Sequence, residues 1–295
     1  MYLDNILMVG NGINRIDNNN SWEDILKDLI KFIDKSDTLL LKDKPFSLLY
    51  EEIVVRGKLY RGKREEEVKK YIANLTSMLI PNNVHKKIMK LGFEHILTTN
   101  YDYTLESALS QELVNTSDIS EIRYSLYRKN KAGSSYVWHV HGEEKTINSI
   151  LLGYEHYAAY IQKMRNYVKG NEKNTTVDNT MTVNTLKVAS WIDLFFTKNI
   201  YIMGLSLDYI EIDLWWLLTY RAREKHLGRY PLNADNEIIY ICTKSEYIAK
   251  PSKMQVLESM GITIKIFDLK GNDWGKFYLE ALDYIEGSQL VRQAI

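Results

Sequence analysis

The sequence predicts an α/β protein built on a doubly wound parallel β-sheet. Short apolar runs rich in Ile and Val recur along the chain, as is typical of strands buried in a parallel sheet. Amphipathic helical stretches separate these runs, and this alternation indicates a Rossmann-like fold. We expect about six strands, at Ile6–Val9, His95–Thr98, Tyr136–Val140, Ile200–Met203, Glu237–Cys242 and Thr263–Phe267.

The helices between these strands are predicted from apolar side chains at helical spacing. The first is expected at Ser21–Ile33, where the Ser21 hydroxyl can cap the helix N-terminus. The others are expected at Val84–Leu91, Val183–Phe196, Leu214–Lys225, Lys253–Met260 and Asp273–Ile285.

We expect residues 1–295 to form one catalytic domain with two insertions, a size that fits a nucleotide-binding core. Residues 16–94 hold helical patterns and no strand pattern, which predicts a helical insertion after the first strand. Residues 143–190 are expected to be mixed. There a helix near Tyr154–Val168 precedes a polar loop over Lys169–Thr182.

Charge and hydropathy argue against nucleic-acid and membrane binding. Lys plus Arg (38) equals Asp plus Glu (38), so the excess of basic side chains that duplex binding needs is missing. The most basic stretch, residues 57–64, adjoins EEEVKK, which favours a solvated helix face over a basic patch. The N-terminus reads as a strand entering a turn, and no apolar stretch approaches the roughly 20 residues of a membrane span. We therefore expect a cytoplasmic protein.

The single cysteine, Cys242, excludes an intramolecular disulfide and a four-cysteine zinc site. It ends the apolar run EIIYIC, so a buried structural thiol is favoured over a nucleophile.

A Gly-x-Gly motif, Gly10-Asn11-Gly12, directly follows the first predicted strand. Such glycines allow a tight turn and a close backbone approach, and the amide groups after them can face a pyrophosphate. Plain turn chemistry is the alternative. The third glycine and the acidic residue of the usual dinucleotide fingerprint are missing, which disfavours an ordinary dehydrogenase.

Polar residues close the second predicted strand in the run Thr98-Thr99-Asn100-Tyr101-Asp102. Doubly wound sheets bind ligands at this end of their strands. An Asp102 turn that caps a helix near Thr104 is the alternative, and it leaves the Thr-Thr-Asn run unexplained.

The third predicted strand ends in His139-Val140-His141-Gly142. Both imidazoles would project to one face of an extended strand, so a metal-binding pair is one interpretation. No further ligands stand at a recognised spacing, and general acid–base chemistry is therefore favoured over metal binding.

The fourth strand leads into Gly204-Leu205-Ser206. This Gly-x-Ser is no nucleophile elbow, because the second glycine is absent and position 208 is Asp. A backbone and hydroxyl contact to a ribose or phosphate fits better.

In this order, Gly-x-Gly, Thr-x-Asn-x-Asp, His-Gly and Gly-x-Ser-Leu resemble the sirtuin motifs GAGxS, TQNxD, HG and GTSL. The closer resemblance is to a divergent bacterial sirtuin-like branch, in which TTNYD, HG and a late GxSLxxxxxD recur and antiphage NADase effectors are common. It spans roughly residues 5–270. The resemblance implies NAD⁺ as the substrate.

The same resemblance implies roles for individual residues. Asn100 matches the asparagine that positions the reactive ribose and a water molecule, and His141 matches the catalytic histidine. Asn14 stands where sirtuins have serine. The implied cofactor-binding residues are Gly10, Asn11, Gly12, Asn14, Thr99, Asp102, Gly204 and Ser206.

Two departures from the sirtuin pattern bear on the expected reaction. A chain with one cysteine cannot build the four-cysteine zinc ribbon of deacetylating sirtuins, and their GIPxFR segment is replaced by residues 17–22. The resemblance therefore implies cleavage of the nicotinamide–ribose bond, giving ADP-ribose or a cyclised form, with no metal. The alternatives are a sirtuin-type deacylase or ADP-ribosyltransferase, and a non-catalytic module that senses NAD⁺ or ADP-ribose.

The aromatic stretch of residues 213–218 is interpreted as core, with a partner interface as the alternative. The resemblance implies an NAD⁺-depleting effector of antiviral defence that acts by abortive infection. We expect it to form a homo-oligomer or to be triggered by a separate sensor subunit or a small-molecule signal.

Overall fold

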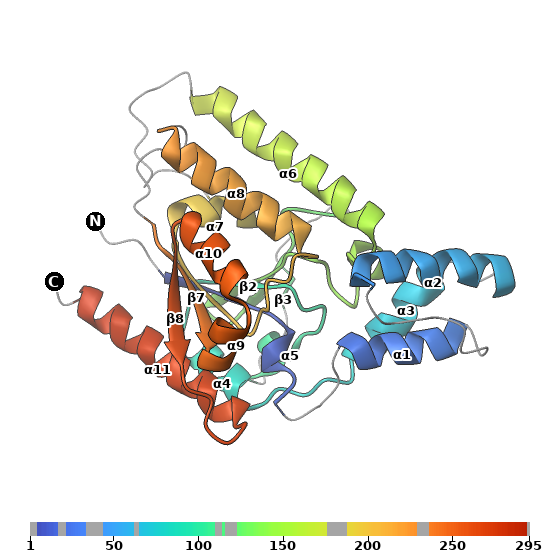
Figure 1. The fold of residues 1–295 in the computed structure, drawn as a ribbon, viewed down its shortest axis with the longest axis horizontal. Helices are drawn as coiled ribbons and strands as arrows, with labels where there is room; N and C mark the ends of the chain where they lie inside the picture. The colour runs from blue at the N-terminus through green and yellow to red at the C-terminus, as the bar shows by residue number, and fades with distance from the viewer. Residues whose placement is uncertain are drawn as a thin grey trace.

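The fold is described from a computed structural model, which covers residues 5–16, 22–33, 44–61, 65–109, 114–115, 123–175, 188–228 and 236–293. Its centre is an eight-stranded sheet of order β3-β4-β5-β2-β1-β6-β7-β8 (Figure 1). Six strands are parallel, which confirms the predicted doubly wound α/β fold. They are β1 (Asn5–Val9), β2 (His95–Thr98), β5 (Ser135–His139), β6 (Asn199–Met203), β7 (Ile238–Thr243) and β8 (Ile262–Phe267).

An antiparallel extension of the sheet was not expected from the sequence. β4 (Lys129–Ala132) pairs with β5, and the two-residue strand β3 (Val114–Asn115) pairs with β4. The β4 sequence KNKA is polar and carries no apolar run, so the pattern that indicates a buried parallel strand is missing there.

Helices cover both faces of the sheet, because successive strand residues point to opposite sides. Ile6 and Met8 pack with α6, α7, α8 and α10, whereas Leu7 and Val9 pack with α4 and α11. In Figure 1, α6 and α8 lie side by side above the sheet, and α11 lies below it. The bounds are α4 (Asn83–Lys90), α5 (Thr104–Ser107), α6 (Tyr154–Thr175), α7 (Trp191–Thr197), α8 (Ile212–His226), α9 (Lys244–Ala249), α10 (Pro251–Ser259) and α11 (Trp274–Gln293).

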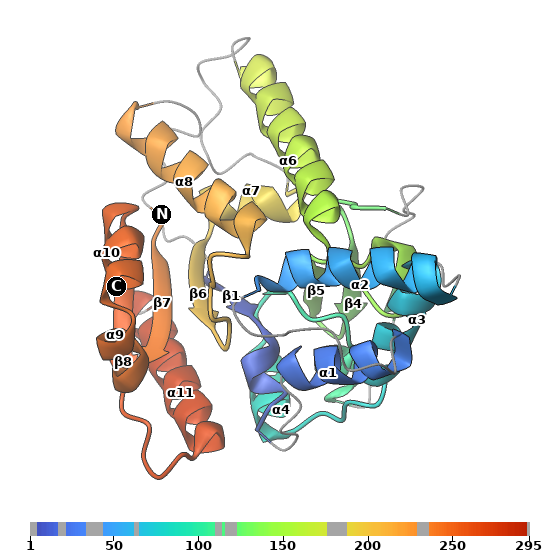
Figure 2. The same cartoon turned by 45° about the vertical axis from the view of Figure 1, so that its right-hand side comes forward.

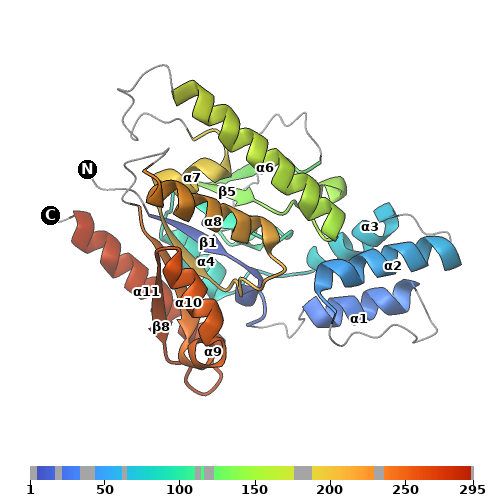
Figure 3. The same ribbon diagram turned by 45° about the horizontal axis from the view of Figure 1, so that its top comes forward.

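Three further helices form a separate cluster beside the sheet. They are α1 (Trp22–Ile33), α2 (Phe46–Arg61) and α3 (Glu65–Thr76), and they lie on the side away from β8 (Figures 2 and 3). Leu29, Tyr50 and Ile72 meet in a third apolar core, which also includes Tyr101, Ile150 and Leu152 from the segments after β2 and β5. Helix α4, also within residues 16–94, instead packs against α11 under the sheet.

Two predicted boundaries around residues 143–190 are wrong. Helix α6 continues through its polar end to Thr175, so residues 169–175 of the predicted loop are helical; the rest of the predicted range lies outside the described residues. The helix predicted from Val183 begins at Trp191, because Ser190 and Asp193 form a capping box there. The start of that prediction, like the Ser21 cap, also lies outside the described residues.

The predicted core role of residues 213–218 is confirmed for its aliphatic members. Leu214, Leu217 and Leu218 are buried, and the half-buried rings of Trp215 and Trp216 pack against the same core. Within the described residues, no helix is long and apolar enough to cross a membrane.

The register of the sheet brings four loops to one edge. Val9 of β1 pairs with Thr98 of β2 and Met203 of β6, and Thr98 pairs in turn with His139 of β5. The loops that follow these four strands therefore leave the sheet at the same level. Because the strand order also reverses direction at β1, this edge is the topological switch point where doubly wound sheets bind ligands.

Helix α4 is joined to the loop after β1 through a buried histidine. His85 Nδ1 accepts from the Asn82 amide at 3.1 Å, so its Nε2 carries the proton that is donated to Asn14 Oδ1 at 2.9 Å. The Asn82 side chain also donates to the Ile13 carbonyl at 2.8 Å. This set of bonds requires a neutral imidazole.

We predict that His85 makes the fold acid-sensitive. Burial lowers the pKa of His85 to about 4. Because this pKa is lower in the folded than in the unfolded chain, its contribution is lost as the pH falls from 6.5 towards 4. Between pH 7 and 4.5 the free energy of unfolding should fall by about 2–3 kcal/mol from this group alone. Urea unfolding of the wild type and of His85→Gln measures it, and an equal fall in both proteins would contradict the prediction.

Candidate functional site

A cleft of about 370 Å³ lies at the switch-point edge, bordered by the loops after β1, β2, β6 and β7 and by α11. Arg15 and the aromatic side chains of Trp274 and Tyr278 face it. Five of the predicted cofactor-binding residues line this cleft: Asn11, Gly12, Thr99, Gly204 and Ser206.

The two glycine loops are in direct backbone contact. The Gly12 amide donates to the Gly204 carbonyl at 2.8 Å. A Cβ at Gly10 would lie 2.8 Å from that carbonyl oxygen, and a Cβ at Gly12 would lie 2.4 Å from the Tyr278 hydroxyl. Glycine is therefore required at both positions for loop packing, whether or not a ligand is bound.

Three of the amides that follow Gly10 do not face the cleft as expected. Those of Gly12, Ile13 and Asn14 donate to carbonyls of the two glycine loops. Because these donors are already used, they are not available to a pyrophosphate in this conformation. The cationic group at this wall of the cleft is the exposed side chain of Arg15.

Asn14 and Asp102 do not line the cleft but bind each other beneath it. Asn14 Nδ2 donates to Asp102 Oδ2 at 2.8 Å, and both side chains are buried. Asp102 Oδ1 also accepts from the Thr104 amide, the first of α5, at 3.0 Å, which is the Asp102 turn that the sequence offered as the alternative. Burial raises the pKa of Asp102, although hydrogen bonds from Thr104 and Asn14 lower it. The pair joins the β1 loop to the β2 loop.

Asn100 is buried between the same two loops. Its Nδ2 donates to the Gly10 carbonyl at 3.4 Å, and its own carbonyl accepts from His139 Nδ1 at 2.9 Å. The other nitrogen of His139 lies 2.8 Å from Glu106 Oε1. Burial lowers the pKa of His139, but the Glu106 carboxylate outweighs it and raises that pKa to about 9. His139 is thus a charged support for Asn100.

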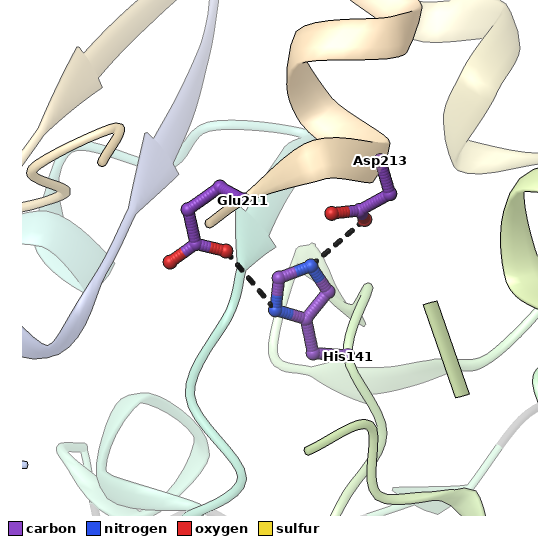
Figure 4. A group of neighbouring side chains, drawn as sticks. All are labelled: His141, Glu211 and Asp213. Carbon is purple, nitrogen blue, oxygen red and sulfur yellow. Dashed lines mark hydrogen bonds and ion pairs between the residues drawn. The ribbon is translucent and has the colours of Figure 1, made fainter. Parts of the chain in front are cut away.

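His141 is buried at the end of β5 and lies between two carboxylates (Figure 4). Its Nε2 is 2.9 Å from Asp213 Oδ2, and its Nδ1 is 3.9 Å from Glu211 Oε2. Burial lowers the pKa of His141, but the carboxylates of Asp213 and Glu211 outweigh it, so the pKa lies above its ordinary value. Asp213 holds the imidazole in place and favours its protonated form.

Glu211 and Asp213 were not assigned as site residues from the sequence. Asp213 is the final residue of the quoted GxSLxxxxxD pattern, which is the signal that points to it. Glu211 has no such signal. It lines the cleft, and burial with the nearby charges of Asp213 and Asp208 raises its pKa to about 7, although His141 acts in the opposite direction.

His139 and His141 do not form a metal-binding pair with each other, because His139 binds Glu106 and His141 binds Asp213. In the part of the chain that the structure describes, one group has the geometry of a metal site: His141, Glu211 and Asp213, with ligand atoms within 4.8 Å of one another. The thiol of Cys242 is buried, as predicted, and burial raises its pKa to about 12, which disfavours a nucleophile.

Comparison with known families bears on these residues. The model of the SIR2-like domain family matches residues 94–262, more than half of the chain. The match runs from the start of β2 to the start of β8 and includes Asn100, His141 and Ser206. No curated protein matches the chain.

We predict that Asp213→Asn lowers the pKa of His141. The substitution removes a negative charge from Nε2 while the burial that opposes protonation remains. Titration of the imidazole resonances by NMR measures the change. Glu224→Gln, at the far end of the same helix, is the control and should leave this pKa unchanged. A His141 pKa that stays the same or rises in Asp213→Asn would contradict the assignment.

We predict that Gly142→Ala destabilises the fold more than Gly261→Ala. Both glycines have positive φ, +95° and +73°, so both substitutions strain the backbone by about 1–2 kcal/mol. Only at Gly142 would the new Cβ also meet an atom, the Ser149 carbonyl oxygen at 2.3 Å, whereas none lies within 4 Å at Gly261. The overpacking should add about 1–3 kcal/mol in urea unfolding. Equal losses of unfolding free energy in the two variants would show that the contact with Ser149 has no cost.

Proposed function

The chain belongs to the SIR2-like domain family, and from this membership we propose that it cleaves the nicotinamide–ribose bond of NAD⁺. The products would be nicotinamide and ADP-ribose, or a cyclised form of ADP-ribose. The observation that supports this most is the His141–Asp213 pair next to a cleft that the glycine loops border. A histidine oriented by a buried carboxylate is an arrangement that serves proton transfer.

In the proposed reaction, the bond between ribose C1′ and the pyridinium nitrogen breaks, and its electron pair goes to nicotinamide. The ribose passes through an oxocarbenium-like state, which a water molecule captures at C1′. Asn100 would orient the ribose and the water without titrating. His141 would accept the proton of the water, an effect typically worth 10²–10⁴ in rate.

The cleft has the chemistry that a dinucleotide requires. Arg15 offers a positive charge for the diphosphate, and the rings of Trp274 and Tyr278 offer an apolar wall for a base. Ser206 lines the opposite loop, where its hydroxyl donates to Asp208 at 2.8 Å. These residues are proposed contacts of NAD⁺.

Cleavage without deacylation is favoured by the cysteine content. One cysteine cannot bind zinc in a four-cysteine ribbon, which deacetylating sirtuins carry. Transfer of an acyl or ADP-ribosyl group to protein, or binding of NAD⁺ without turnover, are the outcomes that a substrate assay separates from hydrolysis.

We further propose that the protein is a cytoplasmic effector that depletes NAD⁺ during phage infection and responds to a trigger. The burial of the two proposed catalytic side chains supports the need for a trigger. Asn100 is 5% exposed and His141 is 2% exposed, so neither is open to the cleft in this conformation. The trigger would be self-assembly or a separate sensor subunit.

We predict that the protein releases nicotinamide from NAD⁺ and that Asn100→Ala and His141→Ala each reduce kcat by about 100-fold or more. Chromatography of the products measures nicotinamide and ADP-ribose, and His226→Ala, at the exposed end of α8, is the matched control. NAD⁺ loss should also appear in cells that express the wild type and are challenged with phage. Undiminished turnover in both active-site variants would overturn the assignment.

A further inference from the structure

Three carboxylates border the cleft, and they differ in their partners. Asp208 lies 3.0 Å from Lys250 Nζ, and Glu246 lies 2.6 Å from Lys253 Nζ, so a lysine offsets each charge. In the described chain, Glu211 has no lysine or arginine within ion-pair distance. Its one ion-pair contact is His141, at 3.9 Å.

One oxygen of Glu211 is also left without a hydrogen bond. Oε2 is buried and finds no partner among the described residues, although a buried carboxylate oxygen is normally satisfied. The same oxygen faces His141 Nδ1, since Asp213 occupies Nε2 on the other side of the ring (Figure 4). Glu211 therefore lines the cleft beside the imidazole, with an acceptor to which no described residue donates a hydrogen bond.

A negative charge at this place suits the breaking of a pyridinium glycosidic bond. As the bond lengthens, positive charge moves from the pyridinium ring onto C1′ and the ring oxygen of the ribose. A preorganised carboxylate beside these atoms lowers the energy of the transition state, and its effect is greater in a site shielded from water.

We propose that Glu211 is a further catalytic residue, whose carboxylate contacts the ribose and stabilises the positive charge that develops on it. This inference rests on the proposed cleavage of NAD⁺. Glu211 forms no covalent bond and keeps its protonation state: the bonding pair goes to nicotinamide, water oxygen bonds to C1′, and the water proton passes to His141.

Neighbouring charges shift the pKa of Glu211, and this pKa determines the pH at which the assay should be run. The charges of His141, Asp213 and Asp208 act on Glu211, and its own charge acts on the buried phenols of Tyr101 and Tyr157. Because its pKa is raised to about 7, the carboxylate is ionised at pH 8. At pH 8 the substitution Glu211→Gln therefore removes a negative charge, and its effect on turnover reports on that charge.

The test compares Glu211→Gln, Glu211→Asp and the same-helix control Glu224→Gln in the full chain. Turnover of NAD⁺ is followed together with the binding of two probes. One is an analogue of ADP-ribose in which a protonated nitrogen replaces the ribose ring oxygen, and the other is ADP-ribose itself. The first probe carries the charge of the transition state and the second does not.

For Glu211→Gln we expect kcat to fall by about 100-fold with KM within about threefold of wild type. Affinity for the cationic probe should fall by a similar factor, while affinity for ADP-ribose stays the same. Glu211→Asp should keep the preference for the cationic probe, and Glu224→Gln should behave as wild type.

Two results would overturn the inference while leaving NAD⁺ cleavage intact: wild-type turnover in Glu211→Gln, or an equal loss of affinity for both probes, which indicates a structural role. A wild-type protein that releases no nicotinamide and causes no NAD⁺ loss in phage-challenged cells would instead remove the proposed function, and this inference with it.

Discussion

The hydrogen bond from the Gly12 amide to the Gly204 carbonyl joins the loops that follow β1 and β6, two strands that are adjacent in the sheet but far apart in the sequence. No Cβ fits at Gly10 or Gly12 while this contact is kept. The contact fixes one wall of the cleft, and the strand register fixes the level at which the β2 and β5 chains reach it. The positions of Asn100 and His141 follow from these two constraints.

Beneath the cleft lies a layer of buried polar groups, each of which binds a neighbour. The Asn14–Asp102 pair joins the β1 and β2 loops, and the His139–Glu106 pair supports the Asn100 carbonyl. Taking such charges out of water costs several kcal/mol per ion, so these pairs are poor devices for stability. Their value lies in holding polar loops in one arrangement.

Much of the sheet was predictable, because Ile-rich apolar runs such as those of β6 and β7 are a local signal. The β3–β4 extension was not, since its pairing is tertiary and its residues are polar. The motifs pointed to the correct edge of the sheet, yet they could not separate residues that border the cleft, such as Ser206, from those that support it, such as Asn14. Glu211 was missed because its only relation to His141 is spatial.

The group formed by His141, Asp213 and Glu211 contains more acidic than basic side chains. Two carboxylates face one imidazole, so when both carboxylates are ionised the group is negatively charged whether or not His141 holds a proton. A bound cation offsets this negative charge, and in the proposed reaction that cation is the pyridinium ring of NAD⁺. Free nicotinamide is neutral and does not. In the proposed reaction, the electrostatics that attract the substrate would therefore also release the leaving group, so that turnover would be favoured over retention of nicotinamide.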